Sequence, residues 1–594
     1  MMNNKGNIKY YLIISQIWYL CHTMSGLAQV PYDDIYRNEA ENYHEQIVLF
    51  TDRNMYAVNE RIFFRSFYRM NGDMAEDILS KVLYVELVTP SGRTVAKGKF
   101  RHGGKGCSGY LTIPVQALTG KYYLRSYTRW MRNYDPRNYC YVPLTIINPF
   151  KKDVLDMGDE SSAADAERFR MDLQGIQCQT SKSSYSPGEE VQLDLCLSPA
   201  EYSLPGEYCV TVVPAGLVDT LAAHVNLKVP GTDVNFSFDY LPDIRGVSIS
   251  GRVVQIEDQL PAPETRLHFS LLGENPGYFA ARSDEMGRFI LTVPDRSGIQ
   301  ELFVAGEASD GIKREIRIDQ DFASVPVPFG TGPFLLSPEK TKAATRMALN
   351  MQLSMAYVQA DVDSAASTET GSMVPFYSIP PSKIIIEDYV DLPNMTEVFE
   401  NLVPEVLVYF RRGEPYLKIL SKNTDIIRFP PLILIDQIPV FDQRAVLSMD
   451  PLKIERIEVI DEVFVKGKMM FGGIIIFTSG KGDMAAIDLP EGSYFFDYQC
   501  FHPGRLIESK DTTGIYQTSD AGSLTDRSGR LNNGDRIPDT RNTLLWIDNV
   551  CLDTDEKKTL HFRSAPETGE YHILVRGVSL QGDILYGSGK FKVE

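Results

Sequence analysis

Short apolar stretches separated by turn-forming residues recur along this chain from about residue 43 to its last residue. Leu83 to Val88 runs as a strand-like apolar stretch into the turn sequence Pro90-Ser91-Gly92, and Tyr571 to Gly577 alternates apolar and polar side chains near the end of the chain. A period of two is typical of a strand with one buried face. Many such strands with turns between them predict a mainly β, multidomain chain of β-sandwiches.

Changes in this pattern divide the chain into seven regions. We predict a signal peptide at 1–28, β-sandwiches at 43–150, 166–245 and 246–320, a helix and polar linker at 335–375, a small α+β domain at 376–482, and a loop-rich segment with a C-terminal β-sandwich at 490–594. The helix is expected to begin at Ser337-Pro338-Glu339, because proline is favoured at the first helical position, and to run to about Gln359.

The stretch from Pro430 to Gly482 carries the strongest local signals. Leu432 to Ile435 is a short continuous apolar run, which is typical of a strand buried on both faces. A turn and a return strand should follow it, and an Asp-Pro pair further on should start a short helical turn. Two glycines then open a β-branched run. The residues that define these motifs are Asp436, Pro439, Asp450, Pro451, Ile457, Glu458, Gly472 and Gly473.

These motifs resemble the plug domain of TonB-dependent outer-membrane receptors. That pattern has a strand ending in Asp-Gly-x-Pro, an Asp-Pro segment leading to Ile-Glu-Val, and a glycine-rich turn before a last strand; here the three parts are Asp436–Pro439, Asp450–Val459 and Gly467–Thr478. The sequence departs from the pattern at Gln437, where glycine is usual, and at Lys468–Phe471, where smaller residues are usual. The resemblance implies a plug-like fold, with a generic α+β interaction domain as the alternative, and a fold alone does not fix a function.

Three further regions resemble known domains. Thr51-Asp52-Arg53 and Gly120-Lys121-Tyr122 are similar to positions in the second domain of the α2-macroglobulin family, and Pro187-Gly188-Glu189 matches a turn of that domain. Ser250–Val254, followed by the turn Asp284–Phe289, resembles a carboxypeptidase regulatory-like sandwich. Together these resemblances imply a chain of immunoglobulin-like, macroglobulin-type β-sandwiches plus one small α+β plug-like domain.

Length and charge restrict the function. The chain has 594 residues and a net charge of −18, and an acidic protein is a poor partner for nucleic acid or a bare anionic membrane. A receptor barrel of about 22 strands would need upwards of roughly 200 residues in strands alone. Only 594 − 482 = 112 residues follow Gly482. The plug-like domain is therefore predicted to lack a barrel of its own.

The first residues are typical of an export signal. Lys5 and Lys9 precede the apolar stretch Tyr10–Leu20, and Gly26-Leu27-Ala28 offers small residues for cleavage before Gln29. A lipid anchor on Cys21 is the alternative, although Leu20 stands where a small residue is needed. No later apolar run reaches the roughly 18 residues that a membrane span requires. We expect a protein secreted across the inner membrane, in the periplasm or associated with the outer membrane, and peripheral to a membrane at most.

Motifs for catalysis and cofactor binding are missing from the sequence. It has no Cys-Gly-Glu-Gln thioester motif, GxSxG elbow or Walker loop. His44-Glu45 begins like a metalloprotease helix, but Val48 stands where the second histidine would be. The cysteines show no metal-ligand spacing. The acidic pair Glu455 and Glu458 flanks Arg456, which favours a solvated, ion-paired face over a glycosidase pair. We therefore predict no catalytic residues, no cofactor and no metal.

These observations favour a non-catalytic cell-envelope protein that acts as a protein-binding or assembly module. Edge strands and loops of β-sandwiches bind partners by strand addition and loop contact. The expected partner is an envelope protein, for which an outer-membrane barrel is one candidate. Two alternatives remain: an accessory of a TonB-dependent outer-membrane transport system, and a hydrolase whose motif is not recognisable.

Overall fold

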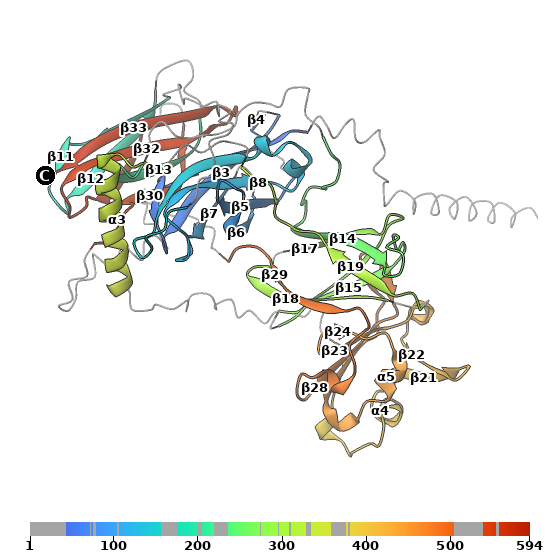
Figure 1. The fold of residues 1–594 in the computed structure, drawn as a ribbon. Helices are drawn as coiled ribbons and strands as arrows, with labels where there is room; N and C mark the ends of the chain where they lie inside the picture. Colours follow the sequence, from blue (N-terminus) through green and yellow to red (C-terminus); the bar gives the residue numbers. More distant parts are fainter. Residues whose placement is uncertain are drawn as a thin grey trace, which may run out of the picture.

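The structure of the protein, a computed structural model, is mainly β and contains several packed sheets (Figure 1). It describes residues 43–71, 73–74, 79–103, 106–155, 175–198, 205–218, 236–273, 275–294, 296–307, 311–327, 334–357, 376–377, 380–503, 539–553 and 557–594. The expected signal peptide and most of the expected polar linker and loop-rich segment lie outside these residues. Within the described part, no helix has the length and apolar character needed to span a bilayer.

The first sandwich has two antiparallel-rich sheets. In one sheet, β3 (Arg61–Met70) lies between β1 (Glu45–Thr51) and β7 (Gly106–Thr112), and the short β4 (Asp73–Met74) pairs with its end. The other sheet has the order β2 (Met55–Ala57), β9 (Cys140–Ile147), β8 (Gly120–Tyr127), β5 (Val82–Val88) and β6 (Thr94–Arg101). Aromatic side chains such as Tyr56, Phe64 and Tyr84 are fully buried in its core. The predicted mainly β sandwich architecture is confirmed.

A second sandwich combines two segments that are far apart in the sequence. One sheet has the order β11 (Ser184–Tyr185), β33 (Ile584–Val593), β32 (Gly569–Ser579), β13 (Gly206–Pro214) and β30 (Leu545–Leu552). The other has the order β10 (Ile176–Thr180), β12 (Glu190–Leu197) and β31 (Lys557–Arg563). We call this domain the composite sandwich. Both neighbours of its strand β13 come from the C-terminal segment.

The prediction of two separate sandwiches, at 166–245 and 490–594, is therefore wrong. Each segment supplies only part of one shared core, in which Leu193 and Val210 pack with Ile547 and Val575. Strand β32 was recognisable from the alternation of apolar and polar side chains in Tyr571 to Gly577. Its pairing partner was not, because the hydrogen bonds of a sheet can join strands at any separation along the chain.

The middle sandwich also takes a strand from a distant segment. One sheet has the order β17 (Arg288–Val293), β14 (Val247–Gln255) and β19 (Arg314–Ile318). The other has the order β16 (Gly277–Arg282), β15 (Arg266–Leu271), β18 (Ile299–Gly306) and β29 (Tyr494–Gln499). Because β29 follows the α+β domain in the chain, the predicted range 246–320 leaves out one edge strand. The start of the predicted C-terminal region supplies that strand instead.

The α+β domain lies between β19 and β29 in the sequence. Its mixed sheet has the order β20 (Ser382–Ile385), β25 (Ile454–Ile460), β28 (Ile474–Ser479), β23 (Leu432–Ile435) and β24 (Ile438–Pro439). Helices α4 (Met395–Leu402) and α5 (Gln443–Leu447) accompany it. Two hairpins complete the domain: β21 (Val406–Arg411) with β22 (Glu414–Ile419), and β26 (Phe464–Lys466) with β27 (Met469–Phe471).

Strand β23 is buried on both faces, as its apolar run predicted. Ile433 and Ile435 belong to the core that contains Phe399 of α4. Leu432 and Leu434 point the other way and pack with Tyr278 of the middle sandwich. The α+β domain therefore packs against the middle sandwich through an apolar interface and is not connected to it by the chain alone.

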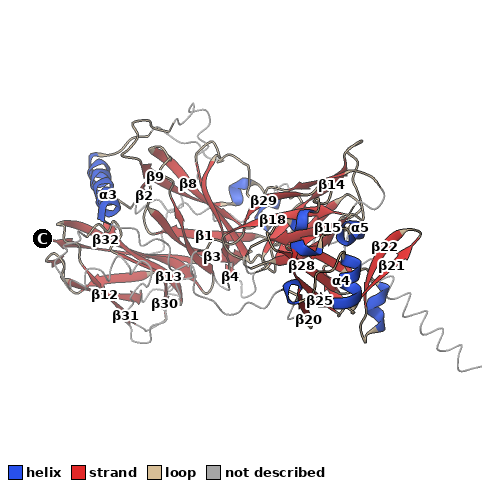
Figure 2. Cartoon of the chain, turned by 90° about the horizontal axis from the view of Figure 1, so that it is seen from below, coloured by secondary structure: helices blue, strands red, loops and turns tan. Residues whose placement is uncertain are grey.

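Helix α3 (Pro338–Tyr357) begins at the predicted proline and packs at the edge of the sandwiches (Figures 1 and 2). Ser337 caps the first turn of the helix, since the Ser337 hydroxyl accepts a hydrogen bond from the Lys340 amide at 3.2 Å. Met347 and Met351 are buried in the same core as Met55, whereas Met355 is 48% exposed. Met347 and Met351 thus serve packing.

Candidate functional site

The candidate site lies where the first sandwich, the middle sandwich and residues 319–327 meet. We call residues 319–327 the strap, because they leave β19 and lie across the first sandwich. Arg125 of β8 donates hydrogen bonds to the carbonyls of Ala323 at 2.6 Å and Val325 at 2.7 Å. The same guanidinium forms a fully buried ion pair with Glu86 of β5, with 2.7 Å between Nη2 and Oε2. This pair fixes the strap to the sheet.

Glu86 is fully satisfied in this arrangement. Its Oε2 also accepts a hydrogen bond from Tyr127 at 2.8 Å, and its Oε1 accepts one from Thr94 at 2.8 Å. Burial is the largest single effect on Arg125 and disfavours its charged form, but the charge and hydrogen bond of Glu86, together with Tyr127 and Tyr141, outweigh it and raise the Arg125 pKa. Arg125 therefore stays charged, and both side chains are held in structural contacts.

A buried lysine joins β6 to the strap and to β29. Lys99 Nζ donates to Asp321 Oδ2 at 2.6 Å, to the Gln499 carbonyl at 2.7 Å and to the Tyr498 hydroxyl at 3.0 Å. These contacts use all three ammonium donors. Burial lowers the pKa of Lys99, and the neighbouring Asp321 carboxylate opposes that effect. Lys99 thus connects three segments that are distant in the sequence.

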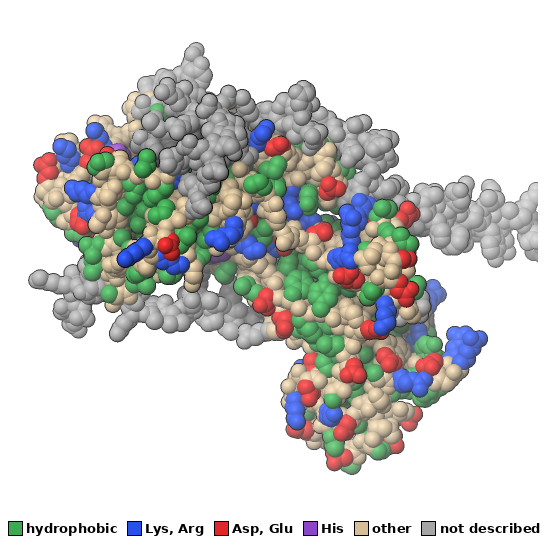
Figure 3. All heavy atoms as spheres, in the orientation of Figure 1, with side chains coloured by type: hydrophobic (Ala, Val, Ile, Leu, Met, Phe, Trp, Pro, Cys, Tyr) green, Lys and Arg blue, Asp and Glu red, His purple; other side chains and the backbone are tan. Residues whose placement is uncertain are grey.

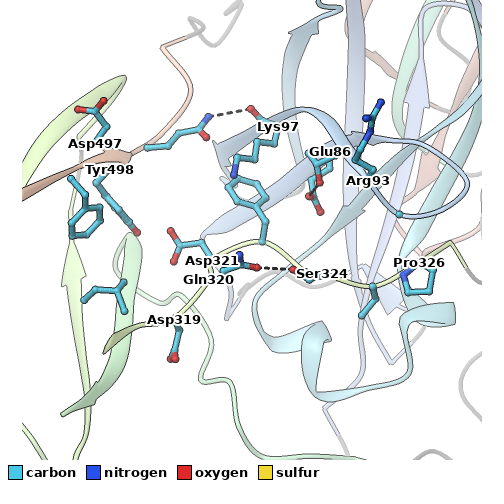
Figure 4. A pocket seen from close by; sticks show the side chains of 18 of the residues that line it. Glu86, Arg93, Lys97, Asp319, Gln320, Asp321, Ser324, Pro326, Asp497 and Tyr498 are labelled. Carbon is cyan, nitrogen blue, oxygen red and sulfur yellow. Dashed lines mark hydrogen bonds between the residues drawn. The ribbon is translucent and has the colours of Figure 1, made fainter. Parts of the chain in front are cut away.

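These contacts surround a pocket with a volume of about 710 Å³ (Figure 4). Strand β6 and the turn before it form one wall, β29 forms the facing wall, and the strap forms the floor. Arg93 and Lys97 lie on the β6 side, and Asp497 lies on the β29 side. All three side chains belong to exposed residues. The pocket therefore has a buried ionic base and an exposed rim with charges of both signs.

The ionic groups at the base of this pocket are used in structural contacts. Its lining contains no histidine or cysteine, and its buried ionic groups are held in structural pairs. Among the described residues, no group of three or more His, Cys, Asp or Glu side chains could hold a metal ion. The sequence analysis did not single out Lys97, Lys99, Asp321 or Asp497. A lysine in an alternating strand has the sequence pattern of a solvent-facing residue, so no local signal marked Lys99 as buried.

The predicted motif residues lie in the α+β domain and not in this pocket. Asp436 and Gln437 form the two-residue turn between β23 and β24, with φ values of 48° and 73°. The Asp436 carboxylate accepts hydrogen bonds from the Ser479 amide at 2.8 Å, the Ser479 hydroxyl at 2.6 Å and the Met484 amide at 2.9 Å. Pro439 pairs with Leu434 in the return strand. Asp436 therefore anchors the turn to the end of β28.

Gln437 shows why glycine is absent from this turn. Both turn residues have positive φ, a conformation that normally favours glycine in the second position. The Gln437 side-chain amide instead contacts Gly273 of the middle sandwich: it accepts from the Gly273 amide at 3.2 Å and donates to its carbonyl at 3.4 Å. A glycine could not make this contact between domains.

The second motif has a structural role within the same domain. Asp450 accepts a hydrogen bond from the Leu452 amide at 3.0 Å and caps the short 3₁₀ helix that Pro451 begins. On β25, Ile457 is fully buried in the domain core. Glu458 is 7% exposed, lies 3.3 Å from Arg456 and accepts from the Tyr377 hydroxyl at 3.3 Å. The ion pair with Arg456 agrees with the expected ion-paired face, but the expectation that this face is solvated is wrong at Glu458, which is buried.

Gly472 and Gly473 occupy positions where a Cβ atom has no room. At Gly472, a Cβ would lie 2.3 Å from the Ile426 carbonyl oxygen and 2.4 Å from that of Phe429. At Gly473, φ is +86° and a Cβ would lie 2.4 Å from the Ile460 carbonyl oxygen. Backbone atoms cannot move aside as a long side chain can, so both positions require glycine.

We expect Gly473→Ala to reduce the free energy of unfolding by about 1–3 kcal/mol, because it adds backbone strain and a main-chain clash. Urea denaturation of the full chain, monitored by far-ultraviolet circular dichroism, would measure the loss. Gly480→Ala is the matched control, since a Cβ there would lie 4.0 Å from its nearest neighbour, the Lys453 carbonyl oxygen. Equal stability of the two variants would contradict the packing described for Gly473.

The seven cysteines from Cys107 to Cys551 that the structure describes are all free thiols. Cys107, Cys140, Cys209 and Cys500 are buried, and burial raises their pKa values to about 11. Buried thiols of high pKa are poor nucleophiles. They therefore add no candidate chemistry to the pocket.

Comparison with known proteins gives no family for this chain. No family model matches it, and no curated protein matches it. Among solved structures, Salmonella α2-macroglobulin reacted with methylamine matches at 9% identity and a TM-score of 0.15, over 93% of this chain and 23% of that one. Trypsin-activated α2-macroglobulin from Escherichia coli matches at 9% identity and a TM-score of 0.22, over 93% and 41%.

Dimeric latent PorU from Porphyromonas gingivalis matches at 8% identity and a TM-score of 0.15, over 46% of this chain and 34% of that one. This chain spans less than half the length of each of these three proteins. Proteins of the α2-macroglobulin type are thus among its structural neighbours at low identity. The functional argument below rests on the residues of this chain alone.

Proposed function

We propose that the protein is an exported, non-catalytic scaffold of the cell envelope that binds an extended segment of a partner protein in the pocket between β6 and β29. The observation that carries this proposal is that each wall of the pocket is the edge strand of its own sheet. Edge strands present main-chain donors and acceptors to an incoming polypeptide.

Two hydrogen bonds within the chain already resemble this kind of strand pairing. The Lys99 carbonyl accepts a hydrogen bond from the His502 amide at 2.6 Å, and the Lys97 carbonyl accepts one from the Gln499 side chain at 3.1 Å. These two carbonyls of β6 are therefore already occupied, and a partner segment that pairs with β6 would replace the contacts made by Gln499 and His502. The exposed charges of Arg93, Lys97 and Asp497 would select the side chains of the incoming segment.

The envelope location rests on the export-type N-terminus, and the partner is accordingly an envelope protein. The accessory role in TonB-dependent transport receives less support. One face of the plug-like sheet packs on the middle sandwich through Leu432, Leu434 and Tyr278, and Gln437 holds the same interface. A domain that is covered in this way cannot be enclosed by a barrel on all sides, so an adaptor function suits it better than a barrel plug.

Site-specific photo-crosslinking tests the pocket. A photoreactive phenylalanine analogue replaces Asp497 in the full-length protein, which is expressed in its native cells. Crosslinking should then give one dominant product with a partner protein. Changing Arg93 and Lys97 together to Glu should abolish that product, because the rim would lose its positive side. The same analogue at Leu580, which is 52% exposed on the composite sandwich, is the control position.

Identical products from positions 497 and 580, or no product from 497, would contradict partner binding in the pocket. The hydrolase alternative needs a different measurement. Purified mature protein should turn over no peptide, ester or glycoside substrate of a broad panel, and measurable turnover would reject the non-catalytic part of the proposal.

A further inference from the structure

The hairpin β21–β22 projects from the α+β domain, at a distance from the pocket (Figures 1 and 2). It forms a sheet of only two strands. Its turn, Arg412-Gly413, has φ values of 55° and 83°. Each of the two strands therefore has one long edge that is not paired within the sheet. The N–H and C=O groups on these two outer edges need hydrogen-bond partners from another element, from solvent or from another molecule.

The outer edge of β22 is closed. The Leu417 amide points away from β21 and donates to Gln443 Oε1 of α5 at 2.7 Å. Pro415 has no amide hydrogen to offer. The remaining outward position, Ile419, lies 1% exposed at the base of the hairpin. No strand can add to this edge.

The outer edge of β21 is open to hydrogen bonding, although helix α4 also contacts this strand. Val408 lies opposite Leu417 and Phe410 lies opposite Pro415. In an antiparallel pair, residues that face each other point their main-chain groups in the same sense, either both inward or both outward. Because the Leu417 amide points outward, Val408 and Phe410 also present their N–H and C=O groups outward. Among the described residues, no hydrogen bond is formed by the amides of Val408 or Phe410.

Apolar and aromatic side chains lie beside this open edge. The rings of Tyr409 and Tyr416 stack with 5.5 Å between their centroids. Leu407 is 45% exposed and Phe410 is 64% exposed. A bare two-stranded sheet with exposed rings is a surface that gains stability when a third strand covers it.

The end of the hairpin is basic. Arg411 and Arg412 are exposed, and neither forms an ion pair with another described residue. Figure 3 shows basic side chains gathered at this end of the domain. The one acidic residue there, Glu414, is paired with Arg444 at 2.9 Å. In a chain with a net charge of −18, this is a local excess of positive charge.

We infer that β21 accepts an extended, acidic peptide of a partner protein as a third strand. Val408 and Phe410 supply the main-chain hydrogen bonds, Leu407 and the Tyr409–Tyr416 pair contact alternate side chains, and Arg411 with Arg412 holds the acidic end. This surface is separate from the pocket, and the inference does not depend on the proposed function. An anionic membrane could engage the two arginines, but it would leave the open main-chain edge unpaired.

Fluorescence anisotropy with the full mature chain tests the inference. The probes are labelled synthetic peptides of alternating valine and threonine that end in two Glu, two Gln or two Lys residues. The Glu peptide should bind at least about tenfold more tightly than the Lys peptide. Phe410→Pro should weaken it by about tenfold or more, because it removes one outward amide without touching the bonds to β22. Pro415 already occupies the equivalent position on the partner strand.

Phe410→Ala is the matched control, since it removes the ring and keeps the amide. Hydrogen exchange at the Tyr409 and Arg411 amides would establish that the hairpin of the Phe410→Pro variant is intact. If it is not, the double variant Arg411→Glu and Arg412→Glu gives the decisive result, because it should reverse the preference to the Lys peptide. Failure of all three peptides to bind, binding that ignores both sets of substitutions, or hairpin-dependent binding only to phosphatidylglycerol vesicles would overturn the inference.

Discussion

Removing residues 541–594 should unfold the composite sandwich and leave residues 175–198 and 205–218 without stable structure. The deletion removes four of its strands, β30 to β33, and with them both neighbours of β13. It also removes Ile547, Leu560, Ile573 and Val575 from the shared core. The strands that remain, β10 to β13, cannot bury their apolar faces, and an isolated small sheet is marginal in water.

Limited proteolysis and hydrogen exchange of the truncated chain would measure this effect. Residues 175–198 and 205–218 should exchange and be cleaved rapidly, whereas the α+β domain should stay protected. Adding residues 541–594 as a separate polypeptide is the matched control, because it should restore protection of 206–214 by re-forming the pairs with β30 and β32. Stable structure at 175–198 and 205–218 in the truncated chain would support separate sandwiches and contradict the composite one.

This arrangement marks the limit of what the sequence could predict. Local features were readable: the proline that starts α3, the doubly buried run of β23 and the Asp436–Pro439 turn all have short-range physical causes. The composite sandwich was not readable, because β13 has the same local pattern whichever strands flank it. Strand β29 was missed for the same reason, since its partner β18 lies beyond the whole α+β domain.

The candidate pocket was harder to predict than the fold. Its base depends on Lys99 and Arg125, which look like solvent-facing residues of alternating strands. They are buried because the strap and β29 cover them, and both covering segments lie far from them in the sequence.

Gln437 is a different case. Its departure from glycine was visible in the sequence, but its cause, a contact with Gly273, required the arrangement of two domains.

The second large effect should come from the ion pair below the pocket. Glu86→Gln keeps the size of the side chain but leaves the Arg125 charge buried without its counter-charge. Breaking one side of a fully buried pair typically costs about 3–5 kcal/mol, so we expect a loss of that order in the free energy of unfolding. The Arg125 pKa, which Glu86 keeps raised against the effect of burial, should fall in this variant.

Urea denaturation at neutral pH would measure the loss, and Glu315→Gln is the control. Glu315 pairs with Arg317, but the two side chains are 48% and 50% exposed, so that change should cost less than about 1 kcal/mol. The double variant Glu86→Leu with Arg125→Met should lose less than the sum of the single changes, since no unpaired charge remains. Hydrogen exchange at the Ala323 amide, which donates to Tyr127 at 2.7 Å, reports whether the strap detaches. A Glu86→Gln variant as stable as Glu315→Gln, with Ala323 still protected, would show that the pair does not hold the strap.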